Sequence, residues 1–406
     1  GPAQPASKSS RPAIKKATRR GPVTRRANFV KIPSKLLRTI RVCITLTIII
    51  TSLFISTMTS NTVFTRLAAI TLVLLSGAAA AQDQVLNLYS ARHYQTDEAL
   101  YNNFTKATGI KINRVDADDA GILARLKAEG AASPADLVLL VDAARLGKAD
   151  MDGLFRPIKS APLEAVIPAQ LRAKPGADGI TWFGFSTRAR VVVYDKLRVQ
   201  KSDVDTYEKL ADPKNKGLLC TRSGSHPYNL SLFGAVTEHL GEAKTEAWLK
   251  GLVANMARPP KGGDTDQIKG VASGECGVAL TNSYYLARVM RSTDPEDKAI
   301  MEKVAVVFPN QQSWGTHVNV AGAAVAKYAK NVSNAVKFME YLASPQAQLY
   351  FAEGNNEWPV VASVKINNPA LQAMTGGSFK AENIPASVIA ANQTRVQQML
   401  DRVGYK

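Results

Sequence analysis

The chain has 406 residues and an uneven distribution of charge. Its formal net charge of +18 comes from 51 Lys and Arg against 33 Asp and Glu. Thirteen of the basic residues and none of the acidic ones precede Gln82, so the rest of the chain carries a net charge of only +5. Because no cluster of Lys and Arg interleaved with aromatic residues follows, the composition argues against a nucleic-acid-binding protein.

Residues 58–81 have the layout of a secretory signal peptide. One basic residue, Arg66, precedes an apolar run over 67–75, and small residues end the segment at Ala81. This order of basic, apolar and small residues is typical of exported proteins. We therefore expect cleavage after Ala81 and export to the periplasm.

Residues 1–57 form a basic segment that is either non-native or disordered. They contain 12 Lys and Arg and no acidic residue, and the first methionine of the chain is Met58. A start codon assigned too far upstream is our preferred interpretation. A tag remnant at Gly1 and Pro2, an off-register twin-arginine signal over 24–29 and a disordered basic tail are the alternatives. The apolar run over 42–55 is too short and Thr-rich to predict a membrane span.

Short apolar strands alternate with amphipathic helices from residue 84 onward. Strands are predicted over 85–89, 110–115 and 135–141, and helices over 96–107, 120–129 and 143–151. Thr96 is the candidate N-cap of the first helix, and Gly109 is its stop. This βαβαβ order predicts a mostly parallel sheet with helices on both faces.

The alternation continues to the end of the chain. Further strands are predicted over 182–194, 218–220, 278–281, 304–308 and 318–325. Further helices are predicted over 230–240, 246–255, 267–273, from Ser283 onward, and over 326–342, 345–353, 369–373 and 386–403. The 325 residues that follow Ala81 are enough for two α/β lobes.

Two cysteines, Cys220 and Cys276, follow the signal peptide, and both lie on or beside predicted strands. In an oxidising compartment an even pair of cysteines can form a disulfide. Two buried free thiols are the alternative. We expect the disulfide.

Three strands end in a short polar loop that leads into a helix and carries tyrosine. The loops are 89–96 with His93 and Tyr94, 220–229 with His226 and Tyr228, and 281–288 with Tyr284 and Tyr285. In open α/β sheets ligands bind beyond the carboxyl ends of the strands, where helix N-termini also point. Each loop alone is explained by packing or turn formation, but their combination predicts one shared site.

Several tyrosines at one site suit a hard, highly charged cation. A phenol has a pKa near 10, but it loses its proton beside such a cation. Zn²⁺ favours Cys, His and carboxylate, and Ca²⁺ takes carboxylate and carbonyl oxygens, so Fe³⁺ fits these donors best. Helix N-termini would stabilise the phenolates. Four phenolates on Fe³⁺ leave one negative charge, which an arginine such as Arg288 would balance.

Over residues 85–406 the chain resembles the periplasmic ferric-ion-binding proteins. The resemblance rests on the segments LNLYSARHY, SPADLVLLVD, FSTRARVVVYD, TNSYYLARV and SPQAQLYFAEGNNEWPV, of which the paired tyrosines are the most specific. It implies an α/β periplasmic binding protein type II fold, with two lobes, crossing hinge strands and a metal cleft between the lobes. On this fold we expect 82–188 and 311–365 in the N-lobe, 189–310 in the C-lobe and 366–406 as C-terminal helices packing on the C-lobe.

The resemblance also implies a set of metal ligands. Tyr284 and Tyr285 match adjacent tyrosine ligands, and Tyr228 matches a third. His93 matches the histidine position, and Tyr94 matches the extra tyrosine of the subgroup that binds iron without an external anion. His93, water or an anion would then complete the coordination.

Other positions match residues that surround those ligands. Arg188 and Arg288 match arginines behind the ligand shell, and Asn282 is retained in type. Val141, with Asp142 beside it, stands where other members have a glutamate ligand, and Asp264 stands where they have an anion-binding asparagine. Both departures argue against the subgroup that uses glutamate and phosphate.

The resemblance implies a monomeric protein that is not an enzyme, uses no organic cofactor and delivers Fe³⁺ to an inner-membrane ABC permease. The first alternative is an organic or anionic solute, such as a polyamine, thiamine or a phosphonate, on the same fold. The lack of a tryptophan near the tyrosines argues against it, since Trp314 and Trp358 lie elsewhere in the sequence. The second alternative, a secreted metallo-hydrolase, lacks HExxH, GxSxG and paired metal carboxylates.

Overall fold

The computed structural model describes residues 84–92, 94 and 96–406. The predicted signal peptide, the segment 1–57 and the candidate ligand His93 lie outside the described residues. The described chain falls within one unit, Gln82–Lys406. No helix among the residues described is long and apolar enough to cross a membrane.

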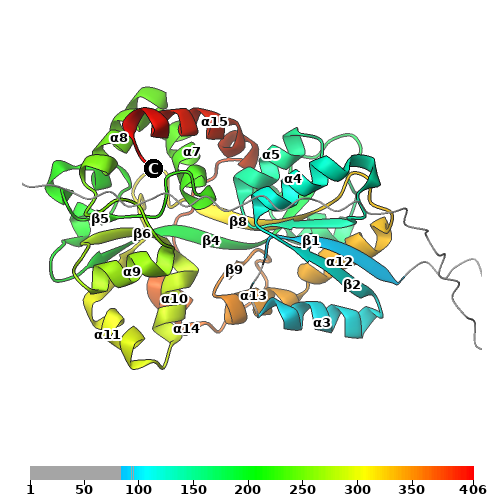
Figure 1. The fold of residues 1–406 in the computed structure, drawn as a ribbon. Helices are drawn as coiled ribbons and strands as arrows, with labels where there is room; N and C mark the ends of the chain where they lie inside the picture. Colours follow the sequence, from blue (N-terminus) through cyan, green and yellow to red (C-terminus); the bar gives the residue numbers. More distant parts are fainter. Residues whose placement is uncertain (1–83, 93, 95) are drawn as a thin grey trace, which may run out of the picture. The chain divides into compact units, whose positions relative to one another are not determined.

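A sheet with the strand order β2-β1-β3-β8-β4 forms the first lobe (Figure 1). β1 (Val85–Ser90) pairs in parallel with β2 (Lys111–Asp116) and β3 (Leu137–Leu140), as the βαβαβ order predicts. β8 (Val318–Val325) pairs antiparallel with β3 and β4, because the chain reaches it on its return from the second lobe. The parallel arrangement therefore ends at β3.

The long strand β4 (Trp182–Asp195) passes from this sheet into a second one, which belongs to the second lobe. Residues 182–189 pair with β8, and β9 (Trp358–Pro359) also pairs with this half. From Arg190 onward, β4 pairs antiparallel with β6 (Val278–Asn282) and β7 (Val304–Val307). β5 (Leu219–Cys220) pairs in parallel with β6. The expectation of a mostly parallel sheet is therefore wrong for the second lobe, where β4 enters and its neighbours return.

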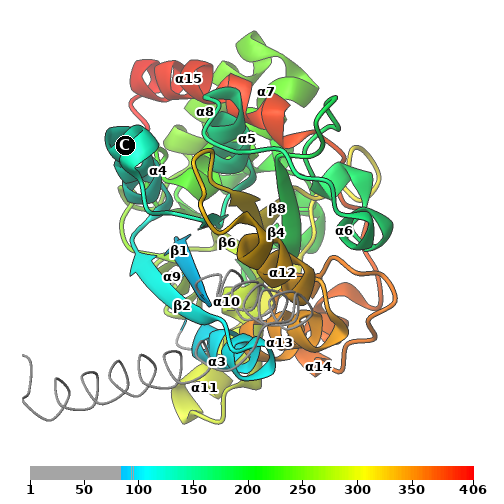
Figure 2. The same cartoon turned by 90° about the vertical axis from the view of Figure 1, so that its right-hand side faces the viewer.

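Helices cover both faces of the first sheet. They are α3 (Asp97–Thr108), α4 (Asp119–Glu129), α5 (Ala143–Met151), α6 (Ala161–Val166), α12 (Val332–Leu342) and α13 (Pro345–Asn355). Figure 2 shows α5 on one side of the strands and α3 and α13 on the other. Gly109 ends α3 in the left-handed conformation with φ 73°, as predicted. Thr96 occupies the N-cap position, but its hydroxyl bonds the Asn355 side chain instead of capping α3.

One predicted helix, 326–342, begins only at Val332. The Asp136 carboxylate accepts hydrogen bonds from the backbone N–H groups of Lys330 (3.1 Å) and Asn331 (2.8 Å), and these hold the preceding residues in a turn. Side chains of Ser, Thr, Asn and Asp compete with helical hydrogen bonds in this way. The periodicity of the sequence could not reveal the role of the Asp136 carboxylate, because Asp136 lies almost 200 residues away in the chain.

The helices of the second lobe are α7 (Pro227–Leu240), α8 (Glu242–Ala254), α9 (Asp264–Ala272), α10 (Ser283–Arg291), α11 (Pro295–Lys303), α14 (Pro369–Thr375) and α15 (Ala386–Val403). α7 begins three residues earlier than predicted, because Pro227 occupies its first turn, which tolerates proline. α6, α11 and β9 are elements that the sequence did not predict. Short 3₁₀ helices lie at Gly130–Ala132, Ala169–Leu171, Lys201–Asp203, Glu208–Ala211 and Pro213–Asn215.

β4 is buried along its whole length because helices lie on both sides of it. Val192 faces a core shared with α7, α8 and α15, whereas Val191 and Val193 face a core shared with α9, α10 and α14. A strand covered on both faces is apolar throughout rather than alternating. This explains the run of valines after Arg190.

The last helix, α15, contacts α5 of the first lobe as well as α7 and α8 of the second (Figure 1). The contact with α5 is close, since a Cβ at Gly147 would lie 2.7 Å from the Ala386 carbonyl oxygen. The predicted packing of 366–406 on the C-lobe did not include this contact. The other lobe boundaries remain a prediction.

Candidate metal centre

Tyr284 lies at the centre of a cluster of tyrosine side chains. It is the second residue of α10, is 1% exposed and follows directly from β6. The Tyr94 hydroxyl donates to the Tyr284 hydroxyl at 3.2 Å, and the hydroxyls of Tyr228 and Tyr284 are also 3.2 Å apart. Tyr94 comes from the loop after β1 in the first lobe, and Tyr228 from the first turn of α7. Three predicted ligands from three loops therefore meet.

Tyr285 completes the cluster. Its ring centroid lies 4.3 Å from that of Tyr284, and its hydroxyl interacts electrostatically with Tyr228 and Tyr284. Arg288 is exposed and lies over the Tyr285 ring, 5.7 Å from its centroid. The adjacent tyrosines thus have different surroundings, since Tyr284 is buried and Tyr285 is half-buried.

Burial keeps the phenols of Tyr94, Tyr228 and Tyr284 neutral in the absence of a cation. Desolvation raises the pKa of Tyr284 and of Tyr228 well above the usual range, and neighbouring tyrosines raise it further. Burial, followed by the charge of Glu357, raises the pKa of Tyr94 to about 12. A bound cation must therefore displace the protons, as is general for metal ligands.

Arg188, the predicted arginine behind the ligands, is a fully buried positive charge beside the cluster. It lies on β4 and interacts electrostatically with Tyr94, Tyr228 and Tyr284. Its Nη2 donates to the Val141 carbonyl oxygen, and its Nη1 lies 3.9 Å from the Glu357 carboxylate. A guanidinium in this position favours the charged form of each phenol and can offset the negative charge of phenolates.

A matching family model and several relatives agree with this arrangement. Residues 99–375 match the model of the bacterial extracellular solute-binding proteins. Iron uptake protein A1 of Synechocystis is 45% identical over 325 residues, which cover 80% of this chain and 88% of that protein.

The chain belongs to the bacterial extracellular solute-binding protein family.

Solved structures lead to the same conclusion about the fold. A Trichodesmium protein (IdiA, FutA) in complex with iron and citrate ligands is 49% identical, with a TM-score of 0.73 over 79% of this chain and all of that chain. The ferric binding protein from Campylobacter jejuni is 37% identical, with a TM-score of 0.74 over the same shares. The predicted family and the type II periplasmic binding protein fold are both confirmed.

Glu357 and Arg92 lie beside the tyrosine cluster of this solute-binding protein, but sequence analysis did not identify them as site residues. Glu357 is fully buried, and its Oε2 accepts from Arg92 (3.0 Å) and from the Ser186 hydroxyl (3.0 Å). Arg92 also pairs with the buried Asp97 at 3.1 Å. Glu357 follows α13, more than 260 residues after Arg92, so only the NEWPV segment of the resemblance pointed to it.

Asp264 and Asn282 hold the tyrosine loops of the second lobe in place. The Asp264 carboxylate lies 2.6 Å from Arg190 and accepts from the Asn282 backbone N–H at 2.7 Å, which fixes the start of α10. Arg190 also donates to the Asn282 side chain (3.2 Å) and to Asn229 (2.8 Å), the residue after Tyr228. One buried arginine therefore joins the two loops.

Asp142 lies at a junction between the lobes. One carboxylate oxygen caps α5 through the Arg145 backbone N–H (3.0 Å). The other accepts from Ser231 of α7 and Asn319 of β8, both at 2.7 Å. Both oxygens are used in joining elements, so the structure gives Asp142 a structural place beside the site.

His226 caps α7 rather than pointing away from it. Its Nδ1 accepts from the Tyr228 backbone N–H at 3.2 Å, and the two rings are 4.6 Å apart. Burial, and then the nearby Arg222 and Arg190, lower the pKa of His226 to about 3. Across the described part of the chain, no group of three or more His, Cys, Asp or Glu is placed to hold a metal ion.

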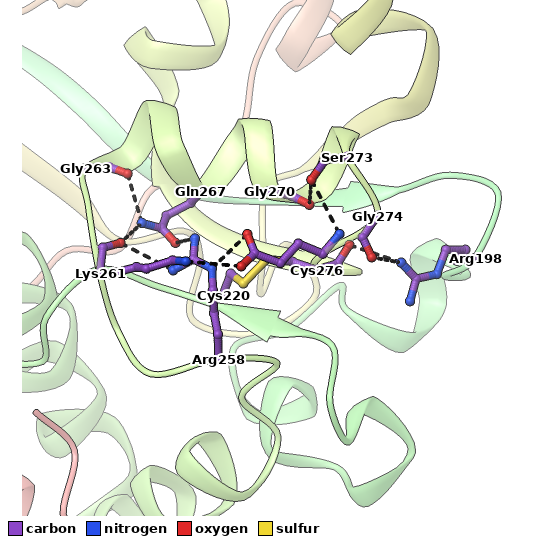
Figure 3. Close-up of a disulfide and its surroundings, with 11 residues drawn as sticks. Arg198, Cys220, Arg258, Lys261, Gly263, Gln267, Gly270, Ser273, Gly274 and Cys276 are labelled. Atoms are coloured by element: carbon purple, nitrogen blue, oxygen red, sulfur yellow. Dashed lines mark hydrogen bonds and ion pairs between the residues drawn. A yellow bond between two sulfur atoms is a disulfide. The ribbon is translucent and has the colours of Figure 1, made fainter.

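A disulfide joins the end of β5 to the residues that precede β6. Cys220 at the end of β5 is bonded to Cys276, two residues before β6, with Cα atoms 5.8 Å apart (Figure 3). Both cysteines are fully buried, and a Cβ at Gly270 of α9 would lie 2.9 Å from the Cys276 sulfur. The disulfide thus sits directly under α9 and links the strands that lead to Tyr228 and Tyr284.

Proposed function

We propose that this protein binds ferric iron in the periplasm through Tyr94, Tyr228, Tyr284 and Tyr285 and delivers it, as a monomer, to an ABC permease of the inner membrane. The observation that carries the proposal is the convergence of three tyrosine hydroxyls beside a buried arginine, with those of Tyr94 and Tyr228 each 3.2 Å from that of Tyr284. The names of the relatives support iron as the cargo. Their roles in uptake and binding support a transport protein rather than an enzyme.

The proposed binding step exchanges protons for a metal ion. Tyr94, Tyr228 and Tyr284 are protonated before iron arrives, because burial raises the pKa of each. Fe³⁺ displaces the protons and leaves hard phenolate oxygens as ligands. Four phenolates and Fe³⁺ carry one net negative charge. Arg188 interacts electrostatically with Tyr94, Tyr228 and Tyr284 and would offset this charge. Its Nη1 also lies 3.9 Å from the Glu357 carboxylate.

The proposed ligands come from both lobes, which links binding to closure. Tyr94 belongs to the first lobe, whereas the other three tyrosines belong to the second. A cation bound by all four would hold the lobes together, and bending of β4 and β8 would let them part. A permease that contacts both lobes could then distinguish the loaded form from the empty one.

The two alternatives find less support. An organic solute would need open aromatic faces for stacking, but Tyr284 is 1% exposed and Tyr228 is 8% exposed. Their hydroxyls instead point at one another, as ligands of one small ion do. A metallo-hydrolase finds no support among relatives named for iron uptake and ferric binding.

The test is the visible absorption spectrum of purified residues 82–406 before and after addition of ferric citrate. Charge transfer from phenolate to Fe³⁺ should colour the protein orange to red, and Tyr285→Phe should weaken the colour. Tyr328→Phe is the matched control, because Tyr328 is exposed and lies in the first lobe after β8. A wild-type protein that stays colourless and takes up no iron would refute the proposal.

A further inference from the structure

The residues that follow α15 lie against the loop that carries Tyr228. Tyr405 is 3% exposed, and its hydroxyl donates to Thr221 Oγ1 at 3.1 Å. Its ring packs against Phe233 of α7, with centroids 5.5 Å apart. The Gly224 backbone N–H donates to the Lys406 carbonyl oxygen at 2.9 Å. Hydrogen bonds therefore join this segment to the loop at two points.

The loop that carries Tyr228 packs closely against Tyr405. A Cβ at Gly224 would lie 2.8 Å from Tyr405 Cδ2, so only glycine lets the loop lie flat on the ring. The Thr221 hydroxyl also accepts from Asn229 Nδ2 at 3.1 Å, and the same amide donates to the carbonyl oxygens of Arg222 and Ser223. Thr221 thus connects Tyr405 to the residue next to Tyr228.

α15 itself is held in place by contacts with helices of both lobes. Its first turn touches Gly147 of α5, and Asn392 donates to the Gly234 carbonyl oxygen of α7 at 3.0 Å. Ile389 and Ala390 pack with Ala144 of α5 in a small core. Because α15 contacts both lobes, the position of Tyr405 is fixed by elements other than the loop that carries Tyr228.

We propose that Tyr405 is a positioning residue of the iron site, which sets the place of Tyr228 relative to Tyr284 by holding Thr221 and Gly224. Tyr405 does not touch the metal; it acts through Thr221 and Asn229. The inference rests on the proposed function. Its physical basis is that a site gains affinity when its ligands are held in place before binding rather than ordered by it.

The decisive experiment removes one hydroxyl from each side of the contact. Tyr405→Phe and Thr221→Val are loaded with Fe³⁺, and the metal is then withdrawn by excess citrate while the charge-transfer absorbance is followed. Tyr405→Phe should lose iron about fivefold faster than wild type, the change expected when one buried hydrogen bond is lost. Thr221→Val should lose it at least as fast, because it also removes the bond from Asn229. The absorbance maximum should also shift, because the Tyr228 oxygen no longer has one fixed position.

The double variant and a control separate positioning from stability. Tyr405→Phe with Thr221→Val should be no faster than Thr221→Val alone, because the Tyr405 hydroxyl acts through the Thr221 hydroxyl that this variant has already lost. Tyr328→Phe should behave as wild type. If one variant fails to fold, the other decides, with the same two readouts.

Two results would overturn the inference. One is a pair of single variants with wild-type dissociation rates and absorbance maxima, even if their melting temperatures fall, since that would mean a purely structural role. The other is a double variant whose rate is the product of the two single effects. A wild type that never becomes coloured would instead refute the proposed function, and this inference with it.

Discussion

At the scale of single residues, burial decides the chemistry of this protein. Tyr228 and Tyr284 are ordinary phenols in sequence, and their pKa rises mainly because the fold removes water from them and places other tyrosines beside them. Type and spacing were enough to nominate Tyr228, Tyr284 and Tyr285, because each follows a strand. Glu357 and Arg92 could not be nominated, since a carboxylate and an arginine far apart in sequence become partners only in the folded chain.

Asp119 shows the same effect on a carboxyl group and predicts a pH dependence of stability. Burial, followed by the charge of Asp142, raises the pKa of Asp119 to about 6 from an ordinary value near 4. The folded protein therefore keeps a proton that the unfolded chain releases. The stability that this proton contributes is present below pH 4 and is lost as the pH rises through 6, by about 2–3 kcal/mol.

Asp119→Asn should remove that dependence. Its amide oxygen can still accept from the Val141 N–H, which lies 2.9 Å from the carboxylate, and it carries no charge. Urea unfolding at pH 4.5 and 7.5 should show the variant gaining stability over wild type at the higher pH. Asp118→Asn, an exposed neighbour that caps α4, is the control. Equal differences from wild type at both pH values would contradict the prediction.

At the scale of elements, periodicity located most helices and strands but not all of their limits. Strands from β1 to β3 and the helices between them were found because each is local and amphipathic. α12 begins late because of Asp136, and α7 begins early because proline fits its first turn. A helix boundary set by a side chain from another element leaves no trace in the local pattern.

The disulfide should contribute strongly to the stability of the second lobe. Cys220 and Cys276 close a loop with a sequence separation of 56, and a cross-link of this length restricts the unfolded chain by about 4 kcal/mol. Replacing both cysteines by alanine should lower the free energy of unfolding by an amount of this order, measured in urea. Reduced wild type should match the double variant. A loss below 1 kcal/mol would show that the unfolded chain is already restricted there.

Gly147 of α5 should be the most sensitive glycine of the contact with α15. A methyl group there meets the Ala386 carbonyl at 2.7 Å and the Ala390 Cβ at 3.1 Å, both on α15. Gly147→Ala should cost about 1–3 kcal/mol in thermal or urea unfolding, despite the better helix propensity of alanine. Gly354→Ala in α13 meets only ordinary contacts at 3.6 Å and should be neutral or stabilising. The reverse order of the two variants would refute the close packing.

At the scale of the whole molecule, strand β4 runs through the sheets of both lobes, and the tyrosine cluster draws side chains from both lobes. Sequence analysis anticipated two α/β lobes and the tyrosine loops. It did not anticipate that α15 contacts α5 as well as α7, because no local pattern encodes which distant face a helix covers. It also expected more parallel pairing than the crossing strand allows.

Closure should depend on Tyr94, the proposed ligand from the first lobe. Addition of ferric citrate should reduce the radius of gyration of residues 82–406 measured by small-angle X-ray scattering. Tyr94→Phe should still acquire colour from the other three tyrosines, but it should show a smaller reduction. Tyr328→Phe should close as wild type does. A full reduction in Tyr94→Phe would mean that this side chain does not link the lobes.

The sequence by itself determined the local features of the described chain: the βα alternation, the two cysteines and the three tyrosine loops. Each depends on neighbours in the chain, so composition and periodicity are sufficient to reveal it. Only the tertiary structure decided which hydroxyls meet, which arginine faces them and which carboxylates hold that arginine. Those contacts join segments up to 265 residues apart, such as Arg92 and Glu357, and they exist because burial forces polar groups to find partners in the fold rather than in water.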